Sequence, residues 1–270
     1  MSSNIADLLS AYNDSNLSDV WIPSTNETIK FRPIIAAHQQ TLLKRLGEAS
    51  FEMAAFSLAL SDIIKSTSTI ALDPNKYTSL DKTIIALQLR LHNISETIDA
   101  TVPDEHVESL GKTVKVDIAQ FIEDLKKSVT PPPVLTVNDG TVKIVLGIPT
   151  MADEMTFTAS IQTSINKVTD NNKTTLDPQA IIGDLVVGTF ATFVEEIEIN
   201  GVKATFWQLP GEQRMQYVKL LNRRLMDACE AHIKELSAYG RQFTTYEVEV
   251  SDKEPVEVSL NIDARMFVES

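Results

Sequence analysis

The sequence predicts an α+β protein in which helices pack on several short antiparallel β-hairpins. Runs of apolar residues at helical spacing alternate along the chain with short β-prone runs. Turn-forming residues separate pairs of those β-prone runs, which is the signature of hairpins. The composition agrees, because 43% hydrophobic and 23% charged residues in a chain of 270 are typical of a globular protein with a real core.

The chain begins with a polar stretch that carries one short apolar cluster. Residues 1–16 are rich in Ser, Asn and Asp, and Ile5, Leu8 and Leu9 form the cluster. We interpret this stretch as a loose tail or a small docking helix, and we favour the docking helix.

A β-hairpin follows, and helices come after it. Two β-prone runs, 20–22 and 28–31, flank the turn-forming residues 23–26, which indicates a hairpin. Pro33 ends the second run and suits a helix start, because the N–H that proline lacks would have no partner there anyway. Apolar residues at helical spacing then predict three helices, over 34–47, 51–64 and 80–91.

The spacing of apolar residues changes twice in the middle of the chain, from helical to alternating and back. We expect Ser79 or Asp81 to cap the third helix. Alternation over 111–117 predicts a strand, and 118–127 returns to a helical pattern. The three prolines 131–133 then form a stiff, polyproline-like connector, which is the clearest internal boundary of the chain.

The segment 134–148 contains the strongest local signal. Asn138-Asp139-Gly140 supplies the positive-φ turn residues that a tight hairpin requires between two β-branched runs. The elements predicted after it are helices over 151–168 and 177–196, a β-prone run 197–207 around Asn200-Gly201, the longest helix 212–239 closed by Gly240, and a final hairpin 246–262 around 251–254.

This order predicts five segments. They are a tail or docking helix 1–16, an α+β lobe 17–130, a proline-led β-hairpin 131–150, a helical lobe 151–240 and a C-terminal β-hairpin 241–270. The prolines either separate two lobes or stiffen one crossover.

The charge balance narrows the classes of partner. Lys and Arg number 24 against 37 Asp and Glu, so the formal net charge is −13. Such a surface repels nucleic-acid phosphates and anionic lipids, so we expect neither as a partner. No stretch approaches the ~20 apolar residues of a membrane span, and the first residues lack the pattern of a signal peptide. We therefore expect a soluble protein that is not exported by the general route, in a reducing compartment because Cys229 has no second cysteine to pair with.

The sequence predicts no catalytic, metal or cofactor site. The motifs GxSxG, GxxxxGK[ST], GxGxxG and HExxH are all absent. Cys229 and His232 have the spacing of half a metal site, but ordinary packing is favoured because nothing nearby supplies the other half. Glu195 and Glu196 are more typical of a solvated face than of an acid–base pair. An unrecognised hydrolase site is kept as an alternative because three ionisable residues lie close in sequence: His92, Glu96 and Asp99.

Two aromatic clusters are candidate interface anchors. Trp21 and Arg32 lie in the first hairpin, and Phe206 and Trp207 precede the longest helix. Trp and Arg are favoured anchors of protein interfaces. Core positions fit both clusters as well, so both interpretations stay open.

Several segments, in this order, carry a family resemblance. Three segments match the pattern of one family, and the pattern ends near Met266-Phe267. The segments are PSTNETIKFRP at 23–33, LDKTIIALQLRLHNISE at 80–96 with Arg90 and Ser95, and TVKIVLGIPTMADE at 141–154. In patches from Asp19 to Phe267 the chain resembles the baseplate hub subunit family of T4-like phages with contractile tails. The chain departs from the family pattern in two places. Asn26 or its neighbours replace the family's turn glycine in the first hairpin. The last hairpin lacks the cysteine that some relatives carry there, so no zinc site is expected from the resemblance.

The resemblance implies a structural, non-enzymatic subunit of the baseplate hub in the virion, present in the host cytoplasm during assembly. The alternative within the family is an assembly chaperone or catalyst of the hub that is absent from the finished particle. Other baseplate and tail proteins are the implied partners, in a hetero-oligomeric assembly. Open hairpin edges at 20–31, 134–148 and 246–262 would let neighbouring strands add to this chain.

Overall fold

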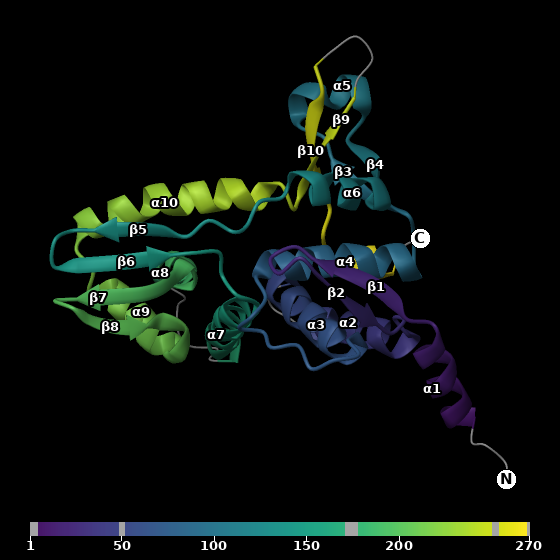
Figure 1. Ribbon diagram of the computed structural model, residues 1–270, viewed down its shortest axis with the longest axis horizontal. Coiled ribbons are helices and arrows are strands. Elements are labelled where there is room, and N and C mark those ends of the chain that lie inside the picture. The colour runs from purple at the N-terminus through teal and green to yellow at the C-terminus, as the bar shows by residue number, and fades with distance from the viewer. Residues whose placement is uncertain (1–4, 49–51, 171–177, 250–253, 269–270) are drawn as a thin grey trace.

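The computed structural model describes residues 5–48, 52–170, 178–249 and 254–268 (Figure 1). Helices and three short antiparallel sheets make up the fold, which confirms the predicted α+β class. The α-helices are α1 (Ile5–Ser15), α2 (Ala36–Glu48), α3 (Glu52–Thr67), α4 (Ser79–Asn93), α5 (Val107–Leu110), α6 (Ile118–Ser128), α7 (Met151–Asp170), α8 (Pro178–Phe193), α9 (Gly211–Lys219) and α10 (Arg223–Arg241). The strands are β1 (Ser18–Ile22), β2 (Glu27–Phe31), β3 (Thr97–Thr101), β4 (Thr113–Asp117), β5 (Leu135–Asn138), β6 (Val142–Leu146), β7 (Val194–Ile199), β8 (Val202–Thr205), β9 (Thr245–Val248) and β10 (Val256–Leu260). Short 3-10 helices are η1 (Asp104–His106), η2 (Phe206–Gln208) and η3 (Ala264–Phe267).

Two hydrophobic cores organise these elements. The first core joins the β1–β2 hairpin, α2, α3, α4 and α6 to the C-terminal residues 243–267. The second core joins the sheet β5-β6-β7-β8 to α8, α9 and α10. The three prolines at 131–133 lie in the connection that leads from α6 to β5, and so from the first core to the second. In Figure 1, α10 runs along the sheet β5-β6-β7-β8 and back toward the first core.

The first hairpin forms as predicted, but other parts of the chain cover its edges. Val20 pairs with Ile29 in the β1–β2 ladder. On the outer side of β1, the N–H of Trp21 donates to Oε1 of Gln88 (2.9 Å), and Nε2 of Gln88 donates back to the Trp21 carbonyl (2.8 Å). Beyond β2, the N–H of Thr69 donates to the Lys30 carbonyl (3.0 Å). The expectation that this hairpin offers a free edge at these positions is therefore wrong.

Helix α4 begins at a buried carboxylate. Thr78, rather than Ser79 or Asp81, is the N-cap, and Asp81 completes a capping box with it. The Asp81 carboxylate is 0% exposed and accepts hydrogen bonds from Ser24 (N, 2.9 Å; Oγ, 2.6 Å) and from Thr78 (N, 2.6 Å; Oγ1, 2.9 Å). One side chain thus binds the start of α4 to the turn between β1 and β2.

The last hairpin closes the first core by pairing with a strand that the sequence analysis missed. The second sheet has the order β4-β3-β10-β9, and Ser259 of β10 lies opposite Thr101 of β3. Strand β3 has only Ile98 and Ala100 as buried residues, which is too short an alternation to stand out from sequence. The central strands of this sheet therefore come from segments far apart in the chain. Most of the turn expected at 251–254 lies outside the described residues.

The 135–146 hairpin has the predicted turn. Gly140 adopts φ 68°, and the N–H of Asp139 donates to the Val142 carbonyl (2.9 Å). Strand β6 then pairs with β7, with Ile144 opposite Ile197, so one edge of this hairpin is covered inside the chain. In the same way β3 covers β10 of the last hairpin. Within the described residues, both hairpins keep one sheet-edge strand each, β5 and β9.

The bounds predicted for two helices in the C-terminal half were wrong. Helix α8 ends at Phe193, and β7 begins at once, although the helix was expected to reach Glu196. The predicted helix 212–239 is two helices, α9 and α10. Helix α10 restarts at Asn222, whose side chain accepts a hydrogen bond from the Leu225 N–H (3.0 Å), and it continues past Gly240 to Arg241.

Replacing the buried carboxylate of Asp81 should destabilise the fold. Asp81→Ala leaves partly buried N–H and O–H donors of Ser24 and Thr78 without their acceptor and removes half of the capping box, so we expect a loss of about 3 kcal/mol in the free energy of unfolding. Urea unfolding followed by circular dichroism measures it. The control Asp99→Ala changes an exposed aspartate and should cost less than about 0.5 kcal/mol. Equal losses in the two variants would contradict this role of Asp81.

The positive φ of Gly140 gives a second stability test. Gly140→Val places a β-branched residue at φ 68° and should cost about 1–2 kcal/mol, because L-residues other than Asn and Asp avoid this region. Gly140→Asn should cost less for the same reason. Thermal unfolding of both variants checks the order, and a valine variant as stable as the asparagine variant would refute it.

Candidate interaction surfaces

The four predicted interface residues form two separate pairs, and each pair has one buried and one exposed member. Trp21 is 7% exposed and Phe206 is 1% exposed, so both are core residues in this chain. Trp207 is 49% exposed, and the Arg32 side chain is 42% exposed. A role in contacts with other subunits stays a prediction for these residues, and only the exposed two are accessible without unfolding.

Trp207 is exposed on η2, and a buried arginine holds this short helix in place. Nη2 of Arg214 donates to the Trp207 carbonyl (2.9 Å), and Nε donates to the Leu209 carbonyl (2.9 Å). Nη1 of Arg214 bonds to Oδ1 of Asp153, and both side chains of this ion pair are 9% exposed. Asp153 is itself fixed by a capping box with Thr150 at the start of α7. The Trp207 indole is therefore presented by a rigid backbone.

This support of Trp207 by Arg214 and Asp153 was not predicted, although the sequence contains one local signal of it. Thr150 followed three residues later by Asp153 is the pattern of a capping box. Nothing in the sequence indicates that Arg214, which lies 61 residues further on, completes the cluster.

Helix α1 carries an apolar stripe that no described part of the chain covers. Ile5, Leu8, Leu9 and Tyr12 recur at helical spacing and are 73%, 56%, 58% and 64% exposed. In Figure 1 the helix extends away from the body of the fold. Oδ1 of Asp14 accepts a bond from Nε of Arg32 (2.6 Å), which ties the end of α1 to the segment after β2. Arg32 thus supports the helix that the sequence analysis interpreted as a tail or docking helix.

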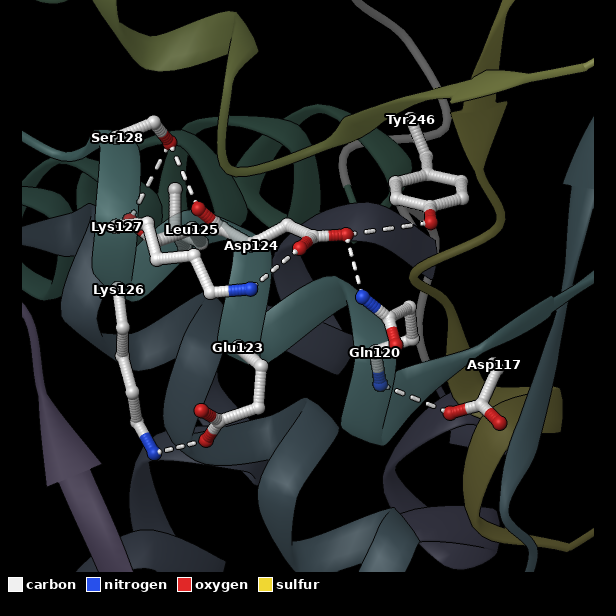
Figure 2. A network of polar contacts seen from close by, with 9 residues as sticks. All are labelled: Asp117, Gln120, Glu123, Asp124, Leu125, Lys126, Lys127, Ser128 and Tyr246. Atoms are coloured by element: carbon white, nitrogen blue, oxygen red, sulfur yellow. Dashed lines mark hydrogen bonds and ion pairs between the residues drawn. The ribbon is translucent and has the colours of Figure 1, made fainter.

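The outward face of α6 carries charges that pair locally (Figure 2). Nζ of Lys126 donates to Glu123 (2.6 Å), and Nζ of Lys127 donates to Asp124 (3.2 Å). Hydrogen bonds from Gln120 and Lys127 lower the pKa of Asp124. Tyr246 of β9 also reaches Asp124 (3.5 Å), and burial raises the pKa of this phenol. These contacts join α6 to the second sheet and leave its acids paired, so we assign the network a structural role.

The residues considered for catalysis and metal binding do not converge. His92, Glu96 and Asp99 are exposed, and of the three only Asp99 lines a described cavity, a polar one of about 80 Å³. The described residues contain no group of three His, Cys, Asp or Glu that could hold a metal ion. No helix in the described chain combines the length and hydrophobicity needed to cross a bilayer.

The two candidate pairs, Cys229 with His232 and Glu195 with Glu196, do not converge either. Cys229 is 0% exposed in the second core, where burial raises its pKa to about 11, whereas His232 faces Glu235 (Nδ1 to Oε2, 3.9 Å). Glu195 and Glu196 are consecutive in β7 and so point to opposite faces of the sheet. Burial raises the pKa of Glu195, and nearby Asp153 adds to the effect, while Glu196 pairs with Lys203 (2.9 Å).

Loss of the buried ion pair should loosen the support of Trp207. Asp153→Asn leaves the Arg214 guanidinium buried without its counter-charge, and we expect about 3 kcal/mol less stability in urea unfolding. Acrylamide should also quench Trp207 fluorescence more strongly, as measured in a Trp21→Phe background. Asp184→Asn, which removes an exposed ion pair to Lys219, is the matched control and should cost less than about 1 kcal/mol. A similar effect of the two substitutions would show that the buried pair is not an anchor.

Comparison with known proteins agrees with the resemblance found in the sequence. A family model described as T4 bacteriophage base plate protein matches residues 17–263. No curated protein and no solved structure matches the chain. The matched span includes the second hydrophobic core, the first core except Met266 and Phe267, and the segment that presents Trp207. Because this span covers most of the sequence, the chain belongs to the T4 bacteriophage base plate protein family.

Proposed function

We propose that this protein is a structural subunit of the hub region of a phage tail baseplate and acts in the virion through contacts with other tail proteins. The observation that carries the proposal is the exposed apolar stripe of α1, in a chain that belongs to a baseplate family. An apolar helix that extends from the body into water is stabilised when a partner covers it. The partners are other baseplate and tail proteins in a hetero-oligomeric assembly.

Two further surfaces support a role in assembly. Trp207 is an exposed aromatic residue on the short helix η2, and large preorganised aromatic side chains are common anchors of interfaces. Strand β8 forms an edge of the described sheet, and Val202 at its start is 74% exposed. Another chain can extend such an edge by adding a strand. We propose no catalysis, metal or cofactor for this chain.

The place of the protein in the particle is open to a direct test. Mass spectrometry of purified virions should find this chain in a fixed ratio to other baseplate proteins. A chain that binds hub precursors in infected cells but is absent from finished particles would contradict the structural role and would support the assembly chaperone or catalyst instead.

The α1 stripe can be tested in the same particles. Leu8→Asp combined with Leu9→Asp changes two exposed residues, so the fold should be unaffected while incorporation into particles drops at least tenfold. Val186→Asp, at an equally exposed apolar residue (60%) of helix α8, is the control and should be incorporated normally. Normal incorporation of the α1 variant would refute docking through this stripe.

A further inference from the structure

A large groove lies between α3 and α7, beside the segment 262–265 that follows β10. Its volume is about 850 Å³. The walls are mainly apolar and include Met53 and Phe56 of α3 and Phe157 and Ile161 of α7. Met53 is 75% exposed, so this surface is in contact with solvent in the isolated chain. Neither the hub proposal nor the family match accounts for it.

An ion pair between Lys82 and Glu154 lines the groove, and only its lysine is buried. Lys82 of α4 is 4% exposed, and its Nζ donates to Oε1 of Glu154 (2.6 Å) and to Oγ of Ser57 (2.7 Å). Oε2 of Glu154 is buried and has no hydrogen-bond partner among the described residues. This oxygen is covered by the chain itself, so an occupant of the groove does not reach it.

The charges around the groove favour a basic occupant. Glu52 at the start of α3 is an exposed residue of the lining, whereas Asp263, also in the lining, pairs with Arg265 (2.6 Å). Lys82 is already neutralised by Glu154. The whole chain carries a net charge of −13, so its field attracts a positively charged segment.

We propose that this groove binds an amphipathic helix of another tail protein, with an apolar stripe flanked by Lys and Arg. A helix is roughly 10–12 Å across, so about three turns sunk to half their depth fill a volume of this size. That the helix comes from a tail protein rests on the proposed function, whereas its chemistry rests on the groove alone. Helix α1 of a second copy fits poorly, because it carries Asp7 and Asp14 and no basic residue.

A peptide titration of the purified full-length chain tests the groove. The probe is a fluorescein-labelled 16-residue helical peptide with a Leu stripe flanked by Lys, and anisotropy reports its binding. Met53→Glu should weaken binding at least tenfold, and Glu52→Lys should weaken it severalfold. Leu220→Glu, at an 80% exposed apolar residue outside the groove, is the matched control and should stay within twofold of the unmodified chain.

The same titration separates the competing occupants. A peptide with Glu in place of every Lys should bind at least tenfold more weakly, and equal binding would overturn the charge argument. Equal affinities of the Met53→Glu and Leu220→Glu variants would overturn the assigned surface. Oleate binding at the groove without peptide binding, or a dimer in sedimentation that Met53→Glu dissolves, would replace the proposed helix with a lipid or a second copy. Because the titration needs no virion, it stands even if the chain proves absent from particles.

Discussion

The fold depends on the pairing of buried polar side chains along α4. A buried carboxylate, amide or guanidinium is costly unless it is hydrogen-bonded, so each of these groups fixes the segment that supplies its partner. Asp81 holds the turn at Ser24, and Gln88 holds the backbone of β1. Arg90 donates to the Thr97 carbonyl (2.9 Å) and to the carbonyl of Met266. One helix therefore binds the first hairpin, the start of β3 and the C-terminal segment, which are far apart in the chain.

A second buried pair does the same beside the second core. Asp153 and Arg214 join the start of α7 to α9 and to the loop after η2. Both clusters use a capping box at a helix N-terminus as one half and a distant segment as the other. The consequence is that the backbone carrying Trp207 is held rigidly while its side chain stays half in water. Such an arrangement suits a protein that presents preformed surfaces to neighbours.

How well the sequence predicted an element depended on how local its cause is. The hairpins at 18–31 and 135–146 follow from turn residues within the hairpins, and both were predicted correctly. Strand β3 and the break between α9 and α10 were missed, because β3 has only two alternating buried residues and the break depends on a single cap at Asn222. The same holds for the surfaces: Trp207 is visible in the sequence as an aromatic residue, but its exposure and its support by Arg214 depend on tertiary packing.

Hydrogen–deuterium exchange of the chain, free and in assembled tails, tests the account most directly. A framework held by α4 with docking surfaces outside it predicts that amides of 79–93 exchange slowly in both states. It also predicts that amides of 5–15 exchange fast in the free chain and become protected in the tail. Fast exchange along α4 in the free chain, or no change in α1 on assembly, would contradict the account.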